Sequence, residues 1–341
     1  MKALVHTPYW DSLGGGERYA ASFIRLLLDH NWQVDICETH AVAPSVFHRF
    51  GLDISKARVV GEYSTLKSLG YNLLFWLSDG SLPTSLAQKT IVHFQFPFHN
   101  AGGAGLTAFF KKHFYTFVVN SHFTKSAIDA EYGVTSDLIY PPIDTQSFTP
   151  GKKTSTILYV GRFSHLTQLK GHATLIRSFK KIYHRLPGWR LILAGGTTVG
   201  TKPEFIAELQ ALSKGFPIHL ITNPAFTQVQ NLCAKASIFW SASGFSSDGD
   251  QDPIRKEHFG MTVVEAMSAG CVPIITNLGG HAEIVEDATN GFLWSTPSEL
   301  EDITLALATD KKKLASISKA AILKSRDFDI SVFNRHFMSL L

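Results

Sequence analysis

The chain has 341 residues, the length of about two domains of roughly 150 residues each. Hydrophobic residues make up 45% of it and charged residues 18%, which excludes an intrinsically disordered protein. The net charge of +4 is too small to indicate a nucleic-acid partner, and its distribution, −1 over residues 1–150 and +5 over the remaining 191, suits a second domain that binds a phosphorylated small molecule.

Residues 1–148 are predicted to form a first domain in which strands and helices alternate. Short runs of β-branched and aromatic residues predict its strands, at Ala3–Thr7, Gln33–Cys37, Arg58–Val60, Thr90–Phe94 and Thr116–Asn120. Apolar residues at helical spacing predict a helix over Glu17–Asp29.

Two aromatic-rich segments of this domain have more than one interpretation. Leu73–Leu77 is apolar, and Leu106–Tyr115 mixes aromatic residues with Lys111, Lys112 and His113. Such stretches can rest on an anionic membrane surface. We expect buried helix packing instead, and the sequence leaves the membrane contact open.

A linker and a second alternating series follow. Pro141–Gly151 has three prolines and no periodicity, and residues 152–327 are predicted to form the second domain. Its predicted strands are Thr156–Val160, Arg190–Ala194, Ile218–Thr222, Ile238–Ser241 and Val272–Thr276. Its predicted helices are Ala173–His184, Glu204–Lys214, Val229–Ala236 and Thr262–Ala269. Whether the last helix, about 328–341, packs back on the first domain stays open.

The alternation predicts an α/β protein with two doubly wound, Rossmann-like parallel-sheet domains that face each other across a cleft. Ligands of such sheets bind beyond the carboxyl ends of the strands. No apolar run approaches the roughly 20 residues of a membrane span, and no secretion signal opens the chain. The scattered Cys37, Cys233 and Cys271 indicate reduced, buried thiols. We therefore expect a cytoplasmic protein, with peripheral contact at the inner membrane face left open.

The strongest local signal is EHFGMTVVEAMSAG, from Glu257 to Gly270. A helix is predicted to begin near Thr262, and a helix N-terminus can hold phosphate. Glu265 either accepts hydrogen bonds from sugar hydroxyls beside that phosphate or closes a capping box with Thr262, and the spacing alone favours the cap. Glu257 lies on the loop before the helix, where no comparable structural role explains it.

Cationic residues and glycines follow two of the predicted strands. Arg162 ends one strand and Lys170 precedes the next helix, so the two can clamp a diphosphate, whereas a solvated surface pair is the plainer alternative. Gly14–Gly16 follow the first strand and either let backbone N–H groups approach an anion or form a simple turn. They do not match G-x-G-x-x-G, which argues against a nicotinamide cofactor.

The acidic segment Asp248–Asp252 raises the question of a metal site. Pro253 and Phe259 occupy the positions where a calcium loop needs glycine and glutamate. We therefore expect a solvated acidic loop and no metal.

Taken in order along nearly the whole chain, these motifs resemble the retaining GT-B glycosyltransferases of family 4, the group 1 glycosyltransferases. The matching segments are GGGER (14–18), YPPID (140–144), VGR (160–162), LKGH (169–172), LAGG (193–196), EHFGMTVVEAMSAG (257–270), NLGGHAEIV (277–285) and NGFLW (290–294). The resemblance implies transfer of a hexose from a nucleotide-diphosphate sugar, without metal or other cofactor. It implies front-side attack, in which the leaving phosphate deprotonates the acceptor hydroxyl.

The resemblance also implies roles for the residues of the second domain. Arg162 and Lys170 would clamp the diphosphate, Glu265 would bind the ribose hydroxyls and Glu257 would hold the donor sugar near its reacting carbon. The backbone of the segment containing Phe259, Gly260, Met261 and Thr262 would read sugar hydroxyls. Members of the family commonly place the lysine five residues after the arginine. Here the two are eight residues apart, so either the loop Ser164–Leu169 bulges or a neighbour takes the clamp role.

In the first domain, the resemblance implies that the Gly15–Gly16 loop helps to bind the diphosphate. It also implies that His93, in HFQFPF, contacts the donor. A satisfied core histidine is an equal interpretation of His93, and His99 and His122 compete for the role.

The motifs GGGER, YPPID and HFGM-x-VVE are similar to those of α-mannosyltransferases that extend lipid-linked oligosaccharides. The similarity favours GDP-mannose slightly over UDP-sugars and implies a glycan or lipid-linked glycan acceptor. Two other functions stay open. A sugar-nucleotide epimerase lacks support from the Glu257–Glu265 spacing, and the intact Arg162 and Lys170 argue against a non-catalytic subunit that only binds a nucleotide-sugar.

Overall fold

The chain builds two parallel sheets, each in its own unit. The structure is a computed structural model that describes residues 1–101, 105–164, 168, 170–197, 200–245 and 252–341. One unit comprises Met1–Pro142 and Ser331–Leu341, and the other comprises Ile143–Ile330. Each unit is described by itself below.

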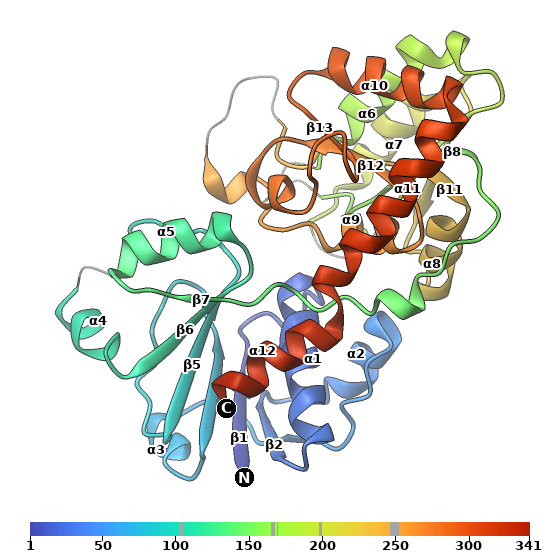
Figure 1. Ribbon diagram of the computed structural model, residues 1–341. Coiled ribbons are helices and arrows are strands. Elements are labelled where there is room, and N and C mark those ends of the chain that lie inside the picture. Colours follow the sequence, from blue (N-terminus) through green and yellow to red (C-terminus); the bar gives the residue numbers. More distant parts are fainter. Residues whose placement is uncertain (102–104, 165–167, 169, 198–199, 246–251) are drawn as a thin grey trace. The chain divides into compact units, whose positions relative to one another are not determined.

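The sheet of the first unit has seven parallel strands in the order β3-β2-β1-β4-β5-β6-β7 (Figure 1). The strands are β1 (Lys2–His6), β2 (Gln33–Cys37), β3 (Arg58–Val59), β4 (Leu73–Leu77), β5 (Lys89–Phe94), β6 (Tyr115–Val119) and β7 (Asp137–Leu138). The helices are α1 (Gly15–Asp29), α2 (Ala43–Phe50), α3 (Thr65–Ser68), α4 (Leu106–Lys111), α5 (His122–Tyr132) and α12 (Ile330–Leu340).

The sheet of the second unit has six parallel strands in the order β10-β9-β8-β11-β12-β13. The strands are β8 (Thr154–Val160), β9 (Arg190–Gly195), β10 (Ile218–Thr222), β11 (Ala236–Ser241), β12 (Val272–Thr276) and β13 (Phe292–Trp294). The helices are α6 (His172–Ile182), α7 (Pro203–Ser213), α8 (Phe226–Lys235), α9 (Met261–Ser268), α10 (Pro297–Thr309) and α11 (Lys311–Ser325). Short 3-10 turns are η1 (Thr145–Ser147), η2 (Tyr183–Arg185), η3 (Pro253–Arg255), η4 (Gly279–Glu283) and η5 (Arg326–Phe328).

Both sheets are doubly wound, as the alternating pattern predicts. In the first unit the chain builds outward from β1 to β3 and then returns to the other side of β1 with β4. In the second unit it builds from β8 to β10 and returns beside β8 with β11. Each reversal makes a switch point, and the carboxyl ends of the strands at such a point are where ligands bind.

The expectation of helix packing for both aromatic segments is wrong in two different ways. Leu73–Leu77 forms β4 at the centre of the first sheet. A strand covered on both faces is apolar along its whole length, which hides the alternation that identifies a strand at a surface. Leu106–Tyr115 does begin with a short helix, but Phe109 and Phe110 are 51% and 63% exposed, and Phe114 just beyond the helix is 79% exposed.

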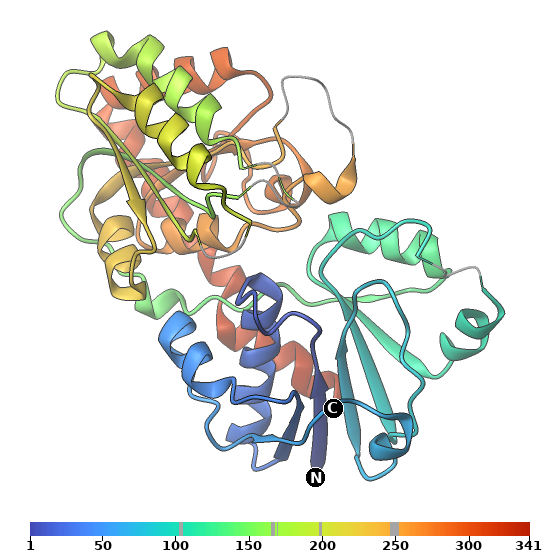
Figure 2. The ribbon, with the colours of Figure 1, turned by 180° about the vertical axis from the view of Figure 1, so that it is seen from behind.

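The C-terminal helix α12 packs on the first unit. The ring of Phe333 lies 5.0 Å from that of Tyr19, and the ring of Phe337 lies 4.6 Å from that of Phe23, both on α1. All four side chains are buried in the same core. The C-terminal helix runs beside α1 in both ribbon views (Figure 2). The chain therefore returns to its first unit at its end.

A buried carboxylate ties the edge of the first sheet together. Asp35 on β2, at 1% side-chain exposure, accepts hydrogen bonds from the Arg58 guanidinium at 2.9 and 3.0 Å and from the Tyr71 hydroxyl at 2.8 Å. Burial by itself raises the pKa of Asp35, but the hydrogen bonds from Arg58 and Tyr71 outweigh it and leave the pKa below its usual value.

We expect Asp35→Asn to lower the free energy of unfolding by about 1–3 kcal/mol, because the charged hydrogen bonds are lost. A lowered pKa stabilises the fold above the unfolded pKa of about 4, and this contribution is lost as the pH falls through the folded pKa. Urea unfolding between neutral and acidic pH measures both effects. Asp29→Asn, which breaks an exposed ion pair with Arg25, is the control. It should lower the free energy of unfolding by less than about 0.5 kcal/mol. Equal costs for the two variants would contradict the interpretation.

Candidate active site

The candidate site lies at the carboxyl edge of the second sheet, where β8 and β11 are neighbours. Glycines let the chain make close contacts there. The N–H of Gly161 donates to the carbonyl of Ala194 at 2.9 Å, and a Cβ on Gly195 would lie 1.9 Å from the carbonyl oxygen of Gly161. The hydroxyls of Tyr159 and Ser243 lie 3.1 Å apart and join the ends of β8 and β11. Arg162 and Lys170 follow directly from this edge.

An ion pair joins two of the residues singled out in the sequence. The Nζ of Lys170 lies 2.8 Å from Oε2 of Glu257, and the side chains are 12% and 13% exposed. Burial alone would raise the pKa of Glu257, but the attraction of the Lys170 ammonium overrides it and holds the pKa at about 2. Glu257 is therefore ionised throughout the physiological pH range.

A chain of hydrogen bonds connects Lys170 of this ion pair to the side chain of His258 and the backbone of Ile254. Lys170 donates to Oε1 of Gln168 at 2.7 Å, and Nε2 of Gln168 lies 3.1 Å from Nδ1 of His258. Nε2 of His258 lies 3.1 Å from the carbonyl of Ile254. Because the Gln168 amide donates to Nδ1, we assign the His258 proton to Nε2, which donates to Ile254. Burial lowers the pKa of His258 to about 4, in keeping with a neutral ring.

Gln168 and His258 were not named as site residues from the sequence. Gln168 lies in the segment that separates Arg162 from Lys170, and His258 lies inside the strongest motif. The spacing hinted that a neighbour could assist the clamp, but nothing in it distinguished Gln168. Within Ser164–Leu169, the described residues are Ser164 and Gln168, so a bulge of this loop stays untested.

The loop at the start of η4 packs against the backbone of Glu257 and His258. The N–H of Gly280 donates to the carbonyl of Glu257 at 2.8 Å. A Cβ on Gly279 would lie 2.2 Å from that same carbonyl oxygen, and a Cβ on Gly280 would lie 2.1 Å from the carbonyl oxygen of His258. Only glycines permit this approach, so the NLGGH segment holds the Glu257 loop in place.

A second histidine lies beneath the N-terminus of α9. Gly260 has φ +109°, and a Cβ there would lie 2.6 Å from Cδ2 of His281. Nδ1 of His281 lies 3.1 Å from the Thr276 hydroxyl, which donates to the carbonyl of Ser243 at 2.8 Å. The ring therefore donates from Nδ1, and burial lowers its pKa to about 4. The EHFGMTVVEAMSAG motif and the NLGGHAEIV motif therefore meet where Gly260 lies against His281.

The capping-box interpretation of Glu265 is wrong. Helix α9 begins at Met261 and its N-cap is Gly260, which has no side chain to close a box. Glu265 lies in the middle of the helix and is 4% exposed. Met261 and Thr262 are half-buried in the first turn, where backbone N–H groups lack partners within the helix. The Phe259 side chain is buried, with its ring 5.4 Å from that of Phe328.

Arg162 is half-buried at the end of β8. Across the described ranges of the chain, its guanidinium forms no ion pair with a carboxylate. Burial raises the pKa of the Tyr159 hydroxyl, the charge of Glu257 raises it further and the charge of Arg162 lowers it. Both residues therefore lie near this buried hydroxyl. The structure thus brings Arg162, Lys170 and Glu257 to one edge of the second sheet.

The remaining predicted site residues belong to the first unit. Gly15 and Gly16 open α1, with Gly14 as the N-cap. Oε2 of Glu17 accepts hydrogen bonds from the N–H of Gly14 at 2.7 Å and from the Ser12 hydroxyl at 2.9 Å. A Cβ on Gly16 would lie 2.1 Å from Oε1 of Gln95, so the lack of a side chain at Gly16 leaves room for the Gln95 amide.

His93 lies on β5 and is fully buried. Its ring stacks on Tyr19 at 3.8 Å and lies 6.0 Å from the ring of Phe75. Burial lowers its pKa to about 3, against a smaller opposing effect of the Val118 backbone. His93 is therefore a neutral ring within the core of the first unit.

Residues 248–251 of the acidic segment lie outside the described residues. In the part of the chain that is described, no group of three or more His, Cys, Asp or Glu side chains could hold a metal ion. Over the same part, no helix is both long enough and apolar enough to cross a bilayer.

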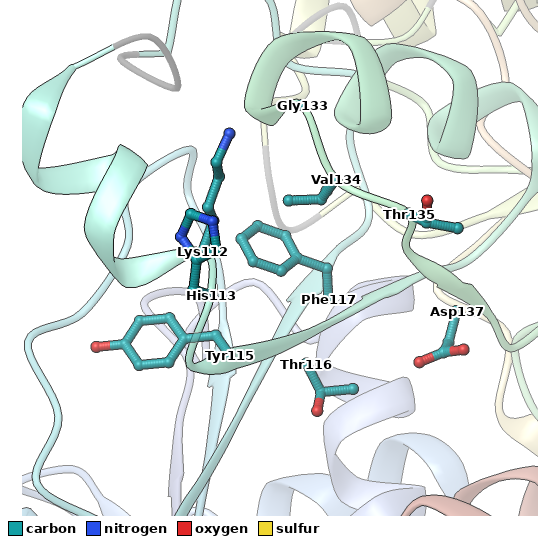
Figure 3. Close-up of a pocket in the computed structure, with 9 residues that line it drawn as sticks. All are labelled: Lys112, His113, Tyr115, Thr116, Phe117, Gly133, Val134, Thr135 and Asp137. Atoms are coloured by element: carbon teal, nitrogen blue, oxygen red, sulfur yellow. The ribbon is translucent and has the colours of Figure 1, made fainter.

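A cavity of about 380 Å³ lies elsewhere, in the first unit (Figure 3). It is lined by Lys112, His113, Tyr115, Thr116, Phe117, Gly133, Val134, Thr135 and Asp137. These residues lie where β6 and β7 begin. The cavity is therefore at the amino edge of its sheet, opposite the edge where parallel sheets bind ligands.

Comparison with known proteins places the site in a family context. A family model described as "Glycosyl transferases group 1" matches residues 142–324, which include Arg162, Lys170, Glu257 and Glu265. The "GDP-Man:Man(3)GlcNAc(2)-PP-Dol alpha-1,2-mannosyltransferase" of Dictyostelium discoideum is 26% identical over 227 residues, 62% of this chain and 43% of the relative. The "GDP-mannose:cellobiosyl-diphosphopolyprenol alpha-mannosyltransferase" of Komagataeibacter xylinus is 27% identical over 194 residues, 55% of this chain and 43% of the relative. The matches thus span less than half of each relative's own length.

Solved structures share the fold. A glycosyltransferase from Rickettsia africae superposes with a TM-score of 0.78 at 16% identity, over 99% of this chain and 97% of the other. Anabaena HepE, solved in complex with UDP-glucose, superposes with a TM-score of 0.77 at 18% identity, over 100% of both chains.

Proposed function

The chain belongs to the group 1 glycosyl transferases and has their GT-B, Rossmann-like fold, and we propose that it transfers mannose from GDP-mannose to a glycan or lipid-linked glycan, with retention of configuration. The observation that carries this proposal is the Lys170–Glu257 ion pair at 2.8 Å, at the switch point of the second sheet. It places a buried cation and an ionised carboxylate side by side, next to the N-terminus of α9.

The arrangement suits a reaction in which negative charge develops on a leaving diphosphate. Lys170 has three donors, of which Glu257 and Gln168 take two, so a third can reach a phosphate oxygen. Arg162 can bind phosphate through two parallel hydrogen bonds. The first N–H groups of α9 and its dipole add to the stabilisation. Together these groups neutralise the leaving group as the glycosidic bond breaks, without a metal ion.

Ionised Glu257 accepts hydrogen bonds from the donor sugar in this proposal, and Glu265 accepts them from the ribose. The leaving phosphate itself deprotonates the acceptor hydroxyl, so no further side chain is needed as base. Gly15 and Gly16, in the first turn of α1, would help to bind the diphosphate. His93 takes the core role in this proposal, because a fully buried neutral ring between Tyr19 and Phe75 supports α1.

The names of the relatives support the donor and the acceptor class. Both are named for GDP-mannose, and both names specify a diphosphate-linked acceptor, on Dol or on polyprenol. The two names share the donor and differ in the acceptor glycan, so they support a common donor more than a common acceptor. We therefore propose GDP-mannose specifically and the acceptor only as a class.

Thermal unfolding with GDP and with UDP tests the base of the donor. We expect GDP to raise the melting temperature, because a ligand that binds only the folded state stabilises it by mass action. Release of GDP from GDP-mannose should follow, and EDTA should leave it unchanged. Stabilisation by UDP alone would replace GDP-mannose by a UDP-sugar. Isomerisation of a nucleotide-sugar without acceptor would favour an epimerase, and binding with no nucleotide release would favour a non-catalytic subunit.

A further inference from the structure

Three phenylalanines at α4 and the turn after it are exposed to solvent. The exposed fractions are 51% for Phe109, 63% for Phe110 and 79% for Phe114. The ring of Phe109 meets that of Phe110 edge-on at 5.7 Å and that of His113 at 5.5 Å, so these three side chains are contiguous, and Phe114 follows His113 directly in the chain. Contiguous exposed apolar surface of this kind marks an interaction site.

Two lysines flank these rings. Lys111 donates to the carbonyl of Leu82 at 3.1 Å, and Lys112 donates to the carbonyl of Tyr132 at 3.3 Å while lying 5.0 Å over the Phe109 ring. Among the residues that the structure places, no carboxylate forms an ion pair with either ammonium. Segment 105–117 contains no acidic residue at all. The lysines are thus held in position by backbone carbonyls, and no carboxylate of the described residues pairs with them.

This surface belongs to the first unit, whereas Arg162, Lys170 and Glu257 belong to the second. It lies ahead of β6, at the edge of the first unit in Figure 1, and it borders the cavity of Figure 3 through Lys112 and His113. The hydroxyls of Thr116 and Thr135 and the carboxylate of Asp137 also line that cavity. Apolar rings, cationic side chains and a polar hollow therefore adjoin one another.

We propose that Phe109, Phe110 and Phe114, together with Lys111, Lys112 and His113, dock the protein on an anionic lipid bilayer; we name these six residues the α4 patch. The phenylalanines enter the boundary between headgroups and acyl chains, and the lysines are attracted by anionic headgroups.

Area and charge favour a bilayer over a protein partner. Three phenylalanines at these exposures offer roughly 400 Å², about half of the 800 Å² that each partner buries in a standard protein interface. Interfacial insertion needs no such area, because binding scales with each buried apolar group and with each cation. The absence of acidic residues from segment 105–117 matches a negatively charged surface.

Co-sedimentation of the full chain with vesicles tests the proposal. We expect binding at low salt to vesicles of equal parts phosphatidylcholine and phosphatidylglycerol, and weak binding to phosphatidylcholine alone. Phe110→Ser with Phe114→Ser should weaken binding by at least about tenfold. Lys111→Gln with Lys112→Gln should weaken it by about fivefold per lysine and flatten its salt dependence.

Matched variants control for the general loss of exposed side chains. Phe47→Ser with Leu323→Ser removes two apolar side chains that are each 60% exposed, outside the α4 patch. Lys311→Gln with Lys312→Gln removes two exposed lysines of α11. Both should bind vesicles as the unmodified chain does, and all variants should keep its melting temperature.

Three results would overturn the proposal. They are no binding to anionic vesicles at low salt, equal binding by the phenylalanine variant, and a dimer in lipid-free buffer that this variant dissociates, which would assign the surface to a second copy. The vesicle experiment contains no donor. A chain that binds vesicles but releases no nucleotide would therefore contradict the proposed function and leave the α4 patch standing.

Discussion

Lys170→Met should lower turnover by about 30- to 1,000-fold, the effect of losing about 2–4 kcal/mol of transition-state stabilisation. The reason is that Lys170 neutralises charge on the leaving diphosphate and also holds Glu257 at 2.8 Å. Without the ammonium, the pKa of Glu257 should rise from its value of about 2, because burial then acts unopposed. Steady-state release of nucleotide from the donor measures the loss.

A double-mutant cycle separates the two roles of Lys170. If the only role of Lys170 were to keep Glu257 ionised, Lys170→Met would not lower turnover further in a Glu257→Gln background. We expect a further loss of at least about tenfold in that background, from the missing phosphate contact. Lys181→Met is the control, since Lys181 pairs with Glu301 at 3.4 Å and is 66% exposed. Unaltered turnover in Lys170→Met would remove the lysine from the mechanism.

Arg162→Ala should lower turnover by a similar factor, about 30- to 1,000-fold, with little change in the melting temperature. Arg162 is half-buried and forms no ion pair within the described ranges, so its removal strands no buried carboxylate. Arg162→Lys should recover only part of the loss, because an ammonium cannot make the paired hydrogen bonds of a guanidinium. Turnover and thermal unfolding, measured on the same preparations, test both statements.

Arg177→Ala provides the matched control for this variant. Arg177 lies on α6 and is exposed, so its loss should change neither turnover nor melting temperature. A large drop in the melting temperature of Arg162→Ala would indicate a structural role instead. Near-normal turnover in that variant would exclude it from the diphosphate clamp.

Several features of the site could be predicted because their signals are local in sequence. Arg162 and Lys170 were found from their positions at the end of a strand and the start of a helix, which the structure places at the switch point. Glu257 was predicted from its position on the loop before the helix, and the spacing of Glu257 and Glu265 pointed to a site through the resemblance to family 4 glycosyltransferases. The spacing Thr262-x-x-Glu265 also led to a wrong prediction, since it satisfies the capping-box pattern although the N-cap of α9 is Gly260, two residues before Thr262. The start of that helix is set by Gly260, whose φ of +109° accommodates His281.

The sequence alone determined the two alternating series, the doubly wound sheets and the residues at the carboxyl edge of the second sheet, because hydrophobic periodicity and turn chemistry act over a few neighbouring residues. Only the tertiary structure decided which of these residues touch. Lys170 meets Glu257 across 87 positions and Gln168 meets His258 across 90. It also made the Leu73–Leu77 run a central strand, because the chain reverses beside β1 and covers that strand on both faces. Such contacts depend on how distant segments pack, and no local pattern records that packing.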